Sequence, residues 1–261
     1  MPELPDIEIR KRYLDSTSLH QKIEAVEVND PIVLDGLTPA ALGKALAGRS
    51  FESTRRHGKH LFVELSEGGW MGMHFGMTGD LQYYKKPAQQ PEYSQVLFHF
   101  QNDYQLAYVM PRKLGHIRLI DSIKAFIEEK ELGPDALEVD FDQFHELFSG
   151  RRGMIKSALM NQGILAGIGN VYSDEILYQA RIYPRQQIKE LEDGGLQKVY
   201  NSMKEVLETA IERHAEPAQY SDSYLIPHRS EGEPCPRCGG KVQKIEVSGR
   251  SGYYCPDCQE G

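Results

Sequence analysis

The sequence contains no long hydrophobic run and no secretory signal. Charged residues or histidine interrupt its apolar segments every few positions, so no stretch reaches the roughly 18 to 20 consecutive apolar residues of a membrane-spanning helix. The first residues lack the basic start and apolar core that mark a signal peptide. We therefore expect a cytoplasmic protein without a membrane span.

The chain also lacks an excess of basic residues. Its 30 basic and 38 acidic residues give a formal net charge of −8, whereas nucleic-acid-binding proteins usually carry a positive excess. Nearly all of this imbalance comes from Leu119–Gly150, and basic residues cluster elsewhere. These clusters are Arg55 and Arg56 with Lys59, Arg112 with Lys113, and Arg151 with Arg152. The net charge is therefore only a weak argument against a nucleic-acid partner.

The first half of the chain has the pattern of a β protein. At 261 residues the chain is long enough for one large or two modest domains. Short β-forming runs separated by turn residues are typical of an antiparallel sandwich or barrel. The runs are 22–28, 50–54, 60–65, 71–77, 81–84, 95–100, 104–109 and 116–120. Two helices are also expected, one from about Pro5 and one over Pro39–Leu46.

The second half changes to a helical pattern, which together with the first half predicts an α+β protein. Helices are expected over 122–130, 142–150, 153–162, 171–180 and 196–214. Gly133 and Pro134 lie within Leu132–Asp140, which we take as the boundary between the two halves. No internal repeat or low-complexity tract is apparent in the sequence.

All four cysteines lie in the last 27 residues. They form two CxxC pairs, Cys235/Cys238 and Cys255/Cys258, and this spacing is typical of tetrahedral zinc coordination by four thiolates. Such a zinc ion is structural because no coordination position remains for water. Disulfides or free thiols are the alternative. Two strands are expected between the pairs, with Arg250 near the tip of the hairpin.

A glycine-rich turn separates two expected helices in GMIKSALMNQGILAGIGNVYSDEILYQA. Gly163, Gly167 and Gly169 precede a helix that starts near Asn170, and a helix N-terminus offers free N–H groups to an anion. A phosphate could sit there, although such a turn could equally be structural. Lys156 could supply a cation to the same anion or simply be solvated.

Several segments resemble the bacterial formamidopyrimidine-DNA glycosylase and endonuclease VIII family. They are MPELPD, RRHGKHL, HFGMTGDL, GIGNVYSDEIL and CPRCGGKV…GRSGYYCPDCQ, and they occur in order over nearly the whole chain. The resemblance implies a β-sandwich domain over 1–132, a helix-two-turns-helix DNA-binding domain over 133–228 and a zinc-finger hairpin over 229–261. It also implies a monomer that binds damaged double-stranded DNA and one structural zinc ion.

The resemblance gives the first residues a catalytic role. Met1 is expected to be removed, so that the secondary amine of Pro2 attacks the sugar of a damaged nucleotide while Glu3 transfers protons there. An α-amine titrates near 7.7 to 8.0, so a useful fraction is neutral and nucleophilic at physiological pH. The resulting iminium is an electron sink, which accounts for strand cleavage by elimination after base loss.

The resemblance also assigns DNA contacts. Lys59, Asn170 and Arg250 are expected to bind phosphates around the lesion, with Lys59 also counted among the catalytic residues. Met77 and Arg112, together with Leu114, are expected to fill the gap left by the everted nucleotide. Packing in the core is the alternative for Met77, and an ordinary surface position is the alternative for Arg112.

Three departures from the family pattern concern substrate choice. Asp6 stands where glutamate is usual, and Met110 and Leu114 replace an expected aspartate and phenylalanine. The segment from His214 to Pro234 is short and lacks the glycine-rich loop that closes over everted 8-oxoguanine. We therefore expect a bifunctional glycosylase and abasic-site lyase for formamidopyrimidine-type purines. An endonuclease VIII-like preference for oxidised pyrimidines and a non-catalytic damaged-DNA-binding protein are the alternatives.

Overall fold

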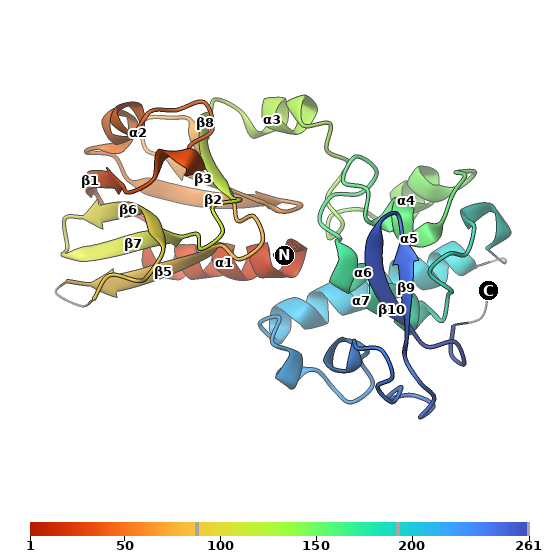
Figure 1. Ribbon diagram of the computed structural model, residues 1–261. Coiled ribbons are helices and arrows are strands. Elements are labelled where there is room, and N and C mark those ends of the chain that lie inside the picture. Colours follow the sequence, from red (N-terminus) through yellow and green to blue (C-terminus); the bar gives the residue numbers. More distant parts are fainter. Residues whose placement is uncertain (87–88, 192–193, 260–261) are drawn as a thin grey trace. The chain divides into compact units, whose positions relative to one another are not determined.

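A computed structural model describes residues 1–86, 89–191 and 194–259. The chain divides into two compact units (Figure 1). Unit 1 contains residues 1–2 and 6–130, and unit 2 contains residues 3–5 and 131–261. The chain therefore passes from one unit to the other in its first six residues and again at residues 130 and 131.

Unit 1 contains two four-stranded antiparallel sheets, with strand orders β1-β6-β7-β5 and β2-β3-β4-β8. The strands are β1 Ile23–Val28, β2 Phe51–His57, β3 His60–Leu65, β4 Trp70–His74, β5 Asp80–Lys85, β6 Ser94–Phe100, β7 Tyr104–Val109 and β8 His116–Ile120. Side chains of both sheets share one apolar core, which includes Leu61, Met71, Phe98 and Tyr108. The predicted antiparallel β-sandwich is confirmed.

Three helices belong wholly or largely to unit 1. They are α1 Leu4–Thr17, α2 Pro39–Leu46 and α3 Ile123–Glu129. Ile7 and Leu14 of α1 are buried in the sandwich core. The side chain of Thr38 accepts a hydrogen bond from Ala41 N–H and so caps α2.

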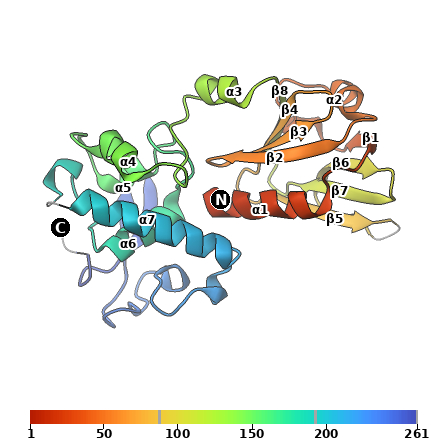
Figure 2. The same ribbon diagram turned by 180° about the vertical axis from the view of Figure 1, so that it is seen from behind.

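Unit 2 is helical. Its longer helices are α4 Phe141–Phe148, α5 Ile155–Leu159, α6 Asn170–Ala180 and α7 Gly195–Glu212, and α7 lies beside α6 (Figure 2). Short 3-10 turns, η2 Ile188–Glu190, η3 Pro217–Gln219 and η4 Ile226–His228, follow α6 and α7. Eight of the eleven residues of α6 are buried, so this helix is the centre of unit 2.

The zinc-finger hairpin also belongs to unit 2. Its strands are β9 Gln243–Val247 and β10 Arg250–Tyr254, paired antiparallel. Tyr178 of α6, Leu225 and Val242 form a small apolar cluster with Cys235 and Cys255. The hairpin therefore packs on α6 and belongs to the same compact unit as the helices.

The structure changes two of the expected elements. Strand β4 ends at His74, because Gly76 has a φ of +56° and the chain turns there. Helix α5 covers only Ile155–Leu159 of the expected 153–162, since residues 161–169 form a turn. Among the described residues, no helix is long and apolar enough to cross a membrane.

Candidate catalytic and DNA-binding residues

The Glu3 side chain lies at the N-terminus of α6. Its carboxylate accepts hydrogen bonds from the backbone N–H groups of Gly169 at 2.6 Å, Val171 at 2.9 Å and Tyr172 at 3.3 Å. Glu3 is only 2% exposed. The free N–H groups and the dipole of a helix N-terminus stabilise a negative charge, so α6 holds this carboxylate in place.

The glycines of the turn make room for Glu3 and for the residue after it. A Cβ atom at Gly169 would lie 2.4 Å from Cδ of Glu3, and one at Gly167 would lie 2.5 Å from Cδ1 of Leu4. Gly167 also has a φ of +119°, and its carbonyl accepts the Leu4 N–H at 3.0 Å. The anion at this turn is thus the Glu3 carboxylate, which accepts hydrogen bonds from three N–H groups that a phosphate could otherwise use.

Pro2 is joined to Glu3 by a peptide bond and is partly exposed. Met1, which precedes it, is 53% exposed. While Met1 is present, the nitrogen of Pro2 is an amide and is not nucleophilic. Removal of Met1 would turn that nitrogen into a secondary amine next to the fixed Glu3 carboxylate.

Lys59 lies in the two-residue turn that joins β2 and β3, where His57 pairs with His60. Gly58 has a φ of +54°, and the turns favoured in such hairpins need a positive φ at this position. Lys59 is 8% exposed, so this ammonium is largely removed from solvent. The turn holds Lys59 at the end of a rigid strand pair.

Three predicted DNA contacts lie on two neighbouring loops of unit 1. Met77 is 40% exposed, Leu114 is 53% exposed, and Arg112 is also exposed. The loops touch at Gly76, where a Cβ atom would lie only 2.6 Å from the carbonyl carbon of Leu114. The packing alternative for Met77 is not supported, because an apolar side chain with this exposure lies outside the core.

Met110, which replaces an expected aspartate, is a core residue. It is fully buried in the sandwich, and a Cβ atom at either Gly79 or Gly115 would come within 2.4 Å of its Cε. Its carbonyl accepts the N–H of Lys113 and the side-chain amide of Gln95. The replacement therefore packs the base of the loop that carries Arg112 and Leu114.

Asn170 and Arg250 lie on neighbouring parts of unit 2. The Asn170 amide donates a hydrogen bond to the carbonyl of Ser251 at 2.7 Å, and Arg250 is the residue before Ser251. Arg250 is exposed, and its guanidinium also lies 3.8 Å from the sulfur of Met160. The first residue of α6 and the start of β10 thus meet directly.

Lys156 differs from its expectation. Its side chain is completely buried rather than solvated, and Nζ donates to Asp174 Oδ1 at 2.5 Å, Ser173 Oγ at 2.8 Å and the Asn170 carbonyl at 3.2 Å. Burial lowers the pKa of this ammonium, and Asp174 opposes the shift. All three protons are used inside the protein, so Lys156 is a buried structural cation in this fold and has no proton left for a phosphate.

The four cysteines form a site that fits one zinc ion. Their sulfurs all lie within 4.8 Å of one another, with Cys235–Cys258 at 3.8 Å and Cys238–Cys255 at 3.5 Å. Four sulfurs at 2.3 Å from a tetrahedral zinc ion would be about 3.8 Å apart, whereas a disulfide needs about 2.05 Å. The predicted structural zinc site is confirmed, and the disulfide alternative is wrong.

A second layer of contacts surrounds the cysteines. The hydroxyl group of Tyr178 lies 3.3 Å from the sulfur of Cys235 and can donate to it. The Arg237 guanidinium stacks over the Tyr178 ring at 4.4 Å and donates to the Tyr178 carbonyl. Such partners orient zinc ligands and stabilise thiolate charge. These contacts could not be predicted from the sequence, because Tyr178 looks like an ordinary core residue of a helix.

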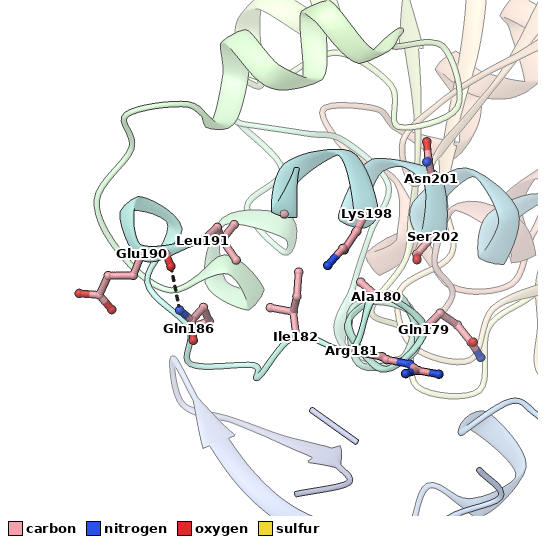
Figure 3. A pocket seen from close by; sticks show the side chains of 11 residues that line it. Gln179, Ala180, Arg181, Ile182, Gln186, Glu190, Leu191, Lys198, Asn201 and Ser202 are labelled. Carbon is pink, nitrogen blue, oxygen red and sulfur yellow. Dashed lines mark hydrogen bonds between the residues drawn. The ribbon is translucent and has the colours of Figure 1, made fainter. Parts of the chain in front are cut away.

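A pocket of about 750 Å³ lies between the C-terminal end of α6 and the start of α7 (Figure 3). Arg181, Ile182 and Lys198 are among its lining residues, and the Gln186 amide donates to the carbonyl of Glu190 at its edge. None of the predicted catalytic, DNA-binding or zinc-binding residues lines this pocket. It is therefore separate from the candidate site.

Comparison with known proteins agrees with this arrangement. Residues 1–117 match the formamidopyrimidine-DNA glycosylase N-terminal domain, residues 132–222 match the H2TH domain of the same enzymes, and residues 232–261 match the zinc finger found in FPG and IleRS. The chain is 33% identical to a formamidopyrimidine-DNA glycosylase of Pelotomaculum thermopropionicum, over 100% of this chain and 99% of the relative. It is 32% identical to one of Arabidopsis thaliana, over 100% of this chain and 71% of the relative.

Solved structures give the same result. A Lactococcus lactis Fpg in complex with abasic-site DNA has a TM-score of 0.88 at 29% identity, covering 99% of this chain and 100% of that chain. The wild-type enzyme of that organism with N7-benzyl-Fapy-dG DNA has a TM-score of 0.90 at 29% identity, covering 100% of both chains. Because family models match most of the chain and a relative is 33% identical to it over 100% of its residues, the chain belongs to the formamidopyrimidine-DNA glycosylase family.

Proposed function

We propose that this chain excises oxidised purines from double-stranded DNA through a covalent imine at Pro2 and then cleaves the strand by elimination. The observation that carries this proposal is the buried carboxylate of Glu3, the residue that follows Pro2. Three backbone N–H groups donate hydrogen bonds to this carboxylate. A carboxylate fixed next to an α-amine can exchange protons with the sugar that the amine attacks. The chain acts as a monomer.

Pro2 and Glu3 carry out the chemical steps of the proposed reaction. The free amine of Pro2 forms a bond to the anomeric carbon as the damaged base leaves with the glycosidic bonding electrons. Proton transfer by Glu3 opens the sugar ring and gives an iminium. Loss of a proton from the neighbouring carbon then expels the phosphate, and water releases the enzyme amine from the product.

DNA is held through its phosphates. Lys59, Asn170 and Arg250 bind the backbone around the lesion, which fixes the position of the duplex without reading its sequence. Met77, Arg112 and Leu114 fill the space that the everted nucleotide leaves. The exposure of these last three side chains supports that role.

The preferred lesion is one that distorts the duplex. Tyr220 and Tyr224 are each 7% exposed and pack into the core of unit 2, and Glu175 accepts the N–H groups of Leu225 and Ile226. The segment from His214 to Pro234 is therefore held against the rest of unit 2 by core packing and hydrogen bonds. A site with few contacts to the everted base discriminates less by base structure. Formamidopyrimidines and abasic sites are accordingly processed faster than 8-oxoguanine opposite cytosine.

Borohydride trapping on an abasic-site duplex tests the mechanism. Protein without Met1 should form a covalent adduct, and protein that retains Met1 or carries an acetylated Pro2 should not. Pro2→Gly should keep partial trapping, since a primary amine still condenses, whereas Glu3→Gln should lose base excision. Equal trapping with a blocked N-terminus would contradict the proposal, and no trapping by any form would favour the non-catalytic alternative.

Single-turnover excision on identical duplexes tests the substrate range. The duplexes carry a formamidopyrimidine, 8-oxoguanine opposite cytosine, an oxidised pyrimidine or an abasic site. Equal rates for 8-oxoguanine and the formamidopyrimidine would show that the short segment does not limit recognition. A faster rate on the oxidised pyrimidine would favour an endonuclease VIII-like preference.

A further inference from the structure

Two side chains of helix α6 make hydrogen bonds to the backbone of β10, on the edge that does not pair with β9. The Asn170 amide donates to the Ser251 carbonyl at 2.7 Å, and Asp174 Oδ2 accepts the Tyr253 N–H at 3.1 Å. Four residues along a helix span about 6 Å, and two residues along a strand span about 6.6 Å. Because these distances match, the two side chains hold alternate residues of β10 in one register on α6.

The second point depends on a buried charge network. Asp174 is completely buried, with Lys156 Nζ at 2.5 Å from Oδ1 and Arg229 Nε at 2.8 Å from Oδ2. A buried carboxylate is costly unless charged partners and hydrogen bonds compensate for its lost hydration. The close packing leaves no room for a side chain at position 252, where a Cβ atom on Gly252 would lie 2.7 Å from Asp174 Oδ1.

Arg229 joins this network from outside the helix and the hairpin. It follows η4, and its side chain is 18% exposed. Its guanidinium lies 4.9 Å from the centre of the Tyr253 ring, on the residue whose N–H reaches Asp174. One side chain therefore contacts both the carboxylate and the strand that the carboxylate holds.

We propose that Arg229, acting through Asp174 and Tyr253, is a positioning residue for the DNA-binding hairpin. By fixing Tyr253 it keeps β10 in register, so that Arg250 stays next to the contact between Ser251 and Asn170. The inference rests on the proposed role of Arg250 as a phosphate contact. It gives the 226–229 turn a part in DNA binding without requiring that the turn touch DNA.

The test measures the affinity for a duplex with a tetrahydrofuran abasic-site analogue over a range of salt concentrations. Each phosphate contact contributes about 0.9 to the slope of log K against log salt concentration. We expect Arg250→Ala to lower the slope by about 0.9, and Arg229→Gln to lower it by a similar amount. The double variant should show no further loss, because both changes remove the same contact.

Controls separate positioning from general electrostatics. Arg213→Gln removes one exposed positive charge of the same unit and should leave the slope unchanged. Arg229→Lys keeps the charge beside Asp174 and should restore most of the affinity. Additive losses in the double variant, or an unchanged slope in Arg229→Gln while Arg250→Ala loses its contact, would overturn the inference.

Hydrogen exchange in the DNA-free protein keeps the inference separate from the role of Arg250. Arg229→Gln should speed exchange of the Tyr253 amide and its neighbours in β10 relative to wild type, while α7 amides stay unchanged. If Arg250→Ala alone leaves the salt slope unchanged, the proposed phosphate role fails, and the exchange data then decide on positioning. Wild-type protection of the Tyr253 amide in Arg229→Gln would overturn it.

Discussion

The Glu3 carboxylate accepts the Gly169 N–H at 2.6 Å, although 166 positions of the chain separate these residues. An acidic side chain from the N-terminus thus completes the start of a helix that has no side-chain cap of its own. This contact explains why the helix begins after a turn of glycines. The position of the Glu3 carboxylate should therefore be sensitive to any atom added at this turn.

Replacing Gly169 by alanine tests this geometry. The added methyl carbon would lie 2.4 Å from Cδ of Glu3, so the carboxylate must move. We expect a loss of at least about tenfold in single-turnover excision and a cost of about 1 to 3 kcal/mol in unfolding free energy. Gly43→Ala in α2 is the control, because nothing lies within 4 Å of its added carbon. Wild-type excision by Gly169→Ala would show that the position of Glu3 is not critical.

Zinc removal should weaken DNA binding more than it weakens the fold. Metal analysis should find one zinc ion per chain, held by four thiolates that the hairpin needs in order to form. After treatment with a chelator, affinity for an abasic-analogue duplex should fall while unit 1 keeps its urea unfolding midpoint. Tyr178→Phe, which removes the hydroxyl group near Cys235, should release zinc to the chelator faster than wild type does. Fully active protein without zinc would contradict this prediction.

Acid should destabilise unit 1 through its histidines. Burial, aided by the neighbouring His74, lowers the pKa of His60 to about 3, and burial lowers the pKa of His74 to about 4. Their contribution to stability is complete above the unfolded value of 6.5 and is lost as pH falls toward 3, because the folded state resists protonation. His60→Phe should therefore flatten the fall in the urea midpoint between pH 6.5 and 4. His145→Gln, at an exposed position, should leave that fall unchanged.

Glu175 should have the opposite pH dependence. Burial raises the pKa of its carboxyl group to about 7, and hydrogen bonds from Gln179, Leu225 and Ile226 oppose the shift. A raised folded pKa gives a contribution that is complete below 4.5 and is lost as pH rises through 7. Relative to wild type, Glu175→Gln should gain stability between pH 4.5 and 7.5, measured by unfolding of unit 2. The exposed Glu205→Gln should show no such trend.

Much of the fold could be predicted from local patterns. The short β-forming runs predicted the eight strands of the sandwich, and the CxxC pairs predicted the zinc site because the ligand spacing is specific. The errors fall where tertiary contacts override local preference. Strand β4 stops at His74 because the loop at Gly76 must pass against Leu114, which is distant in sequence.

In the candidate site, too, contacts between residues distant in sequence could not be predicted. An ammonium on a short helix near a glycine turn predicts a solvated group or an anion contact, and sequence could not reveal that Asp174 and Ser173 enclose Lys156. The glycine turn indicates that an anion could lie there, but not that the anion is the Glu3 carboxylate. A glutamate in the first turn of the chain gives no local sign of its partner in unit 2.

The two contacts from α6 to β10 bear on how relatives could be recombined. A graft of residues 229–261 alone would carry Arg229 and Tyr253 but leave Asp174 behind. In a recipient with an uncharged residue at that position, Arg229 would lose its buried counter-ion and the strand would lose one of its two anchors. The hairpin is therefore not a portable module, and a working chimaera has to exchange α6 together with it.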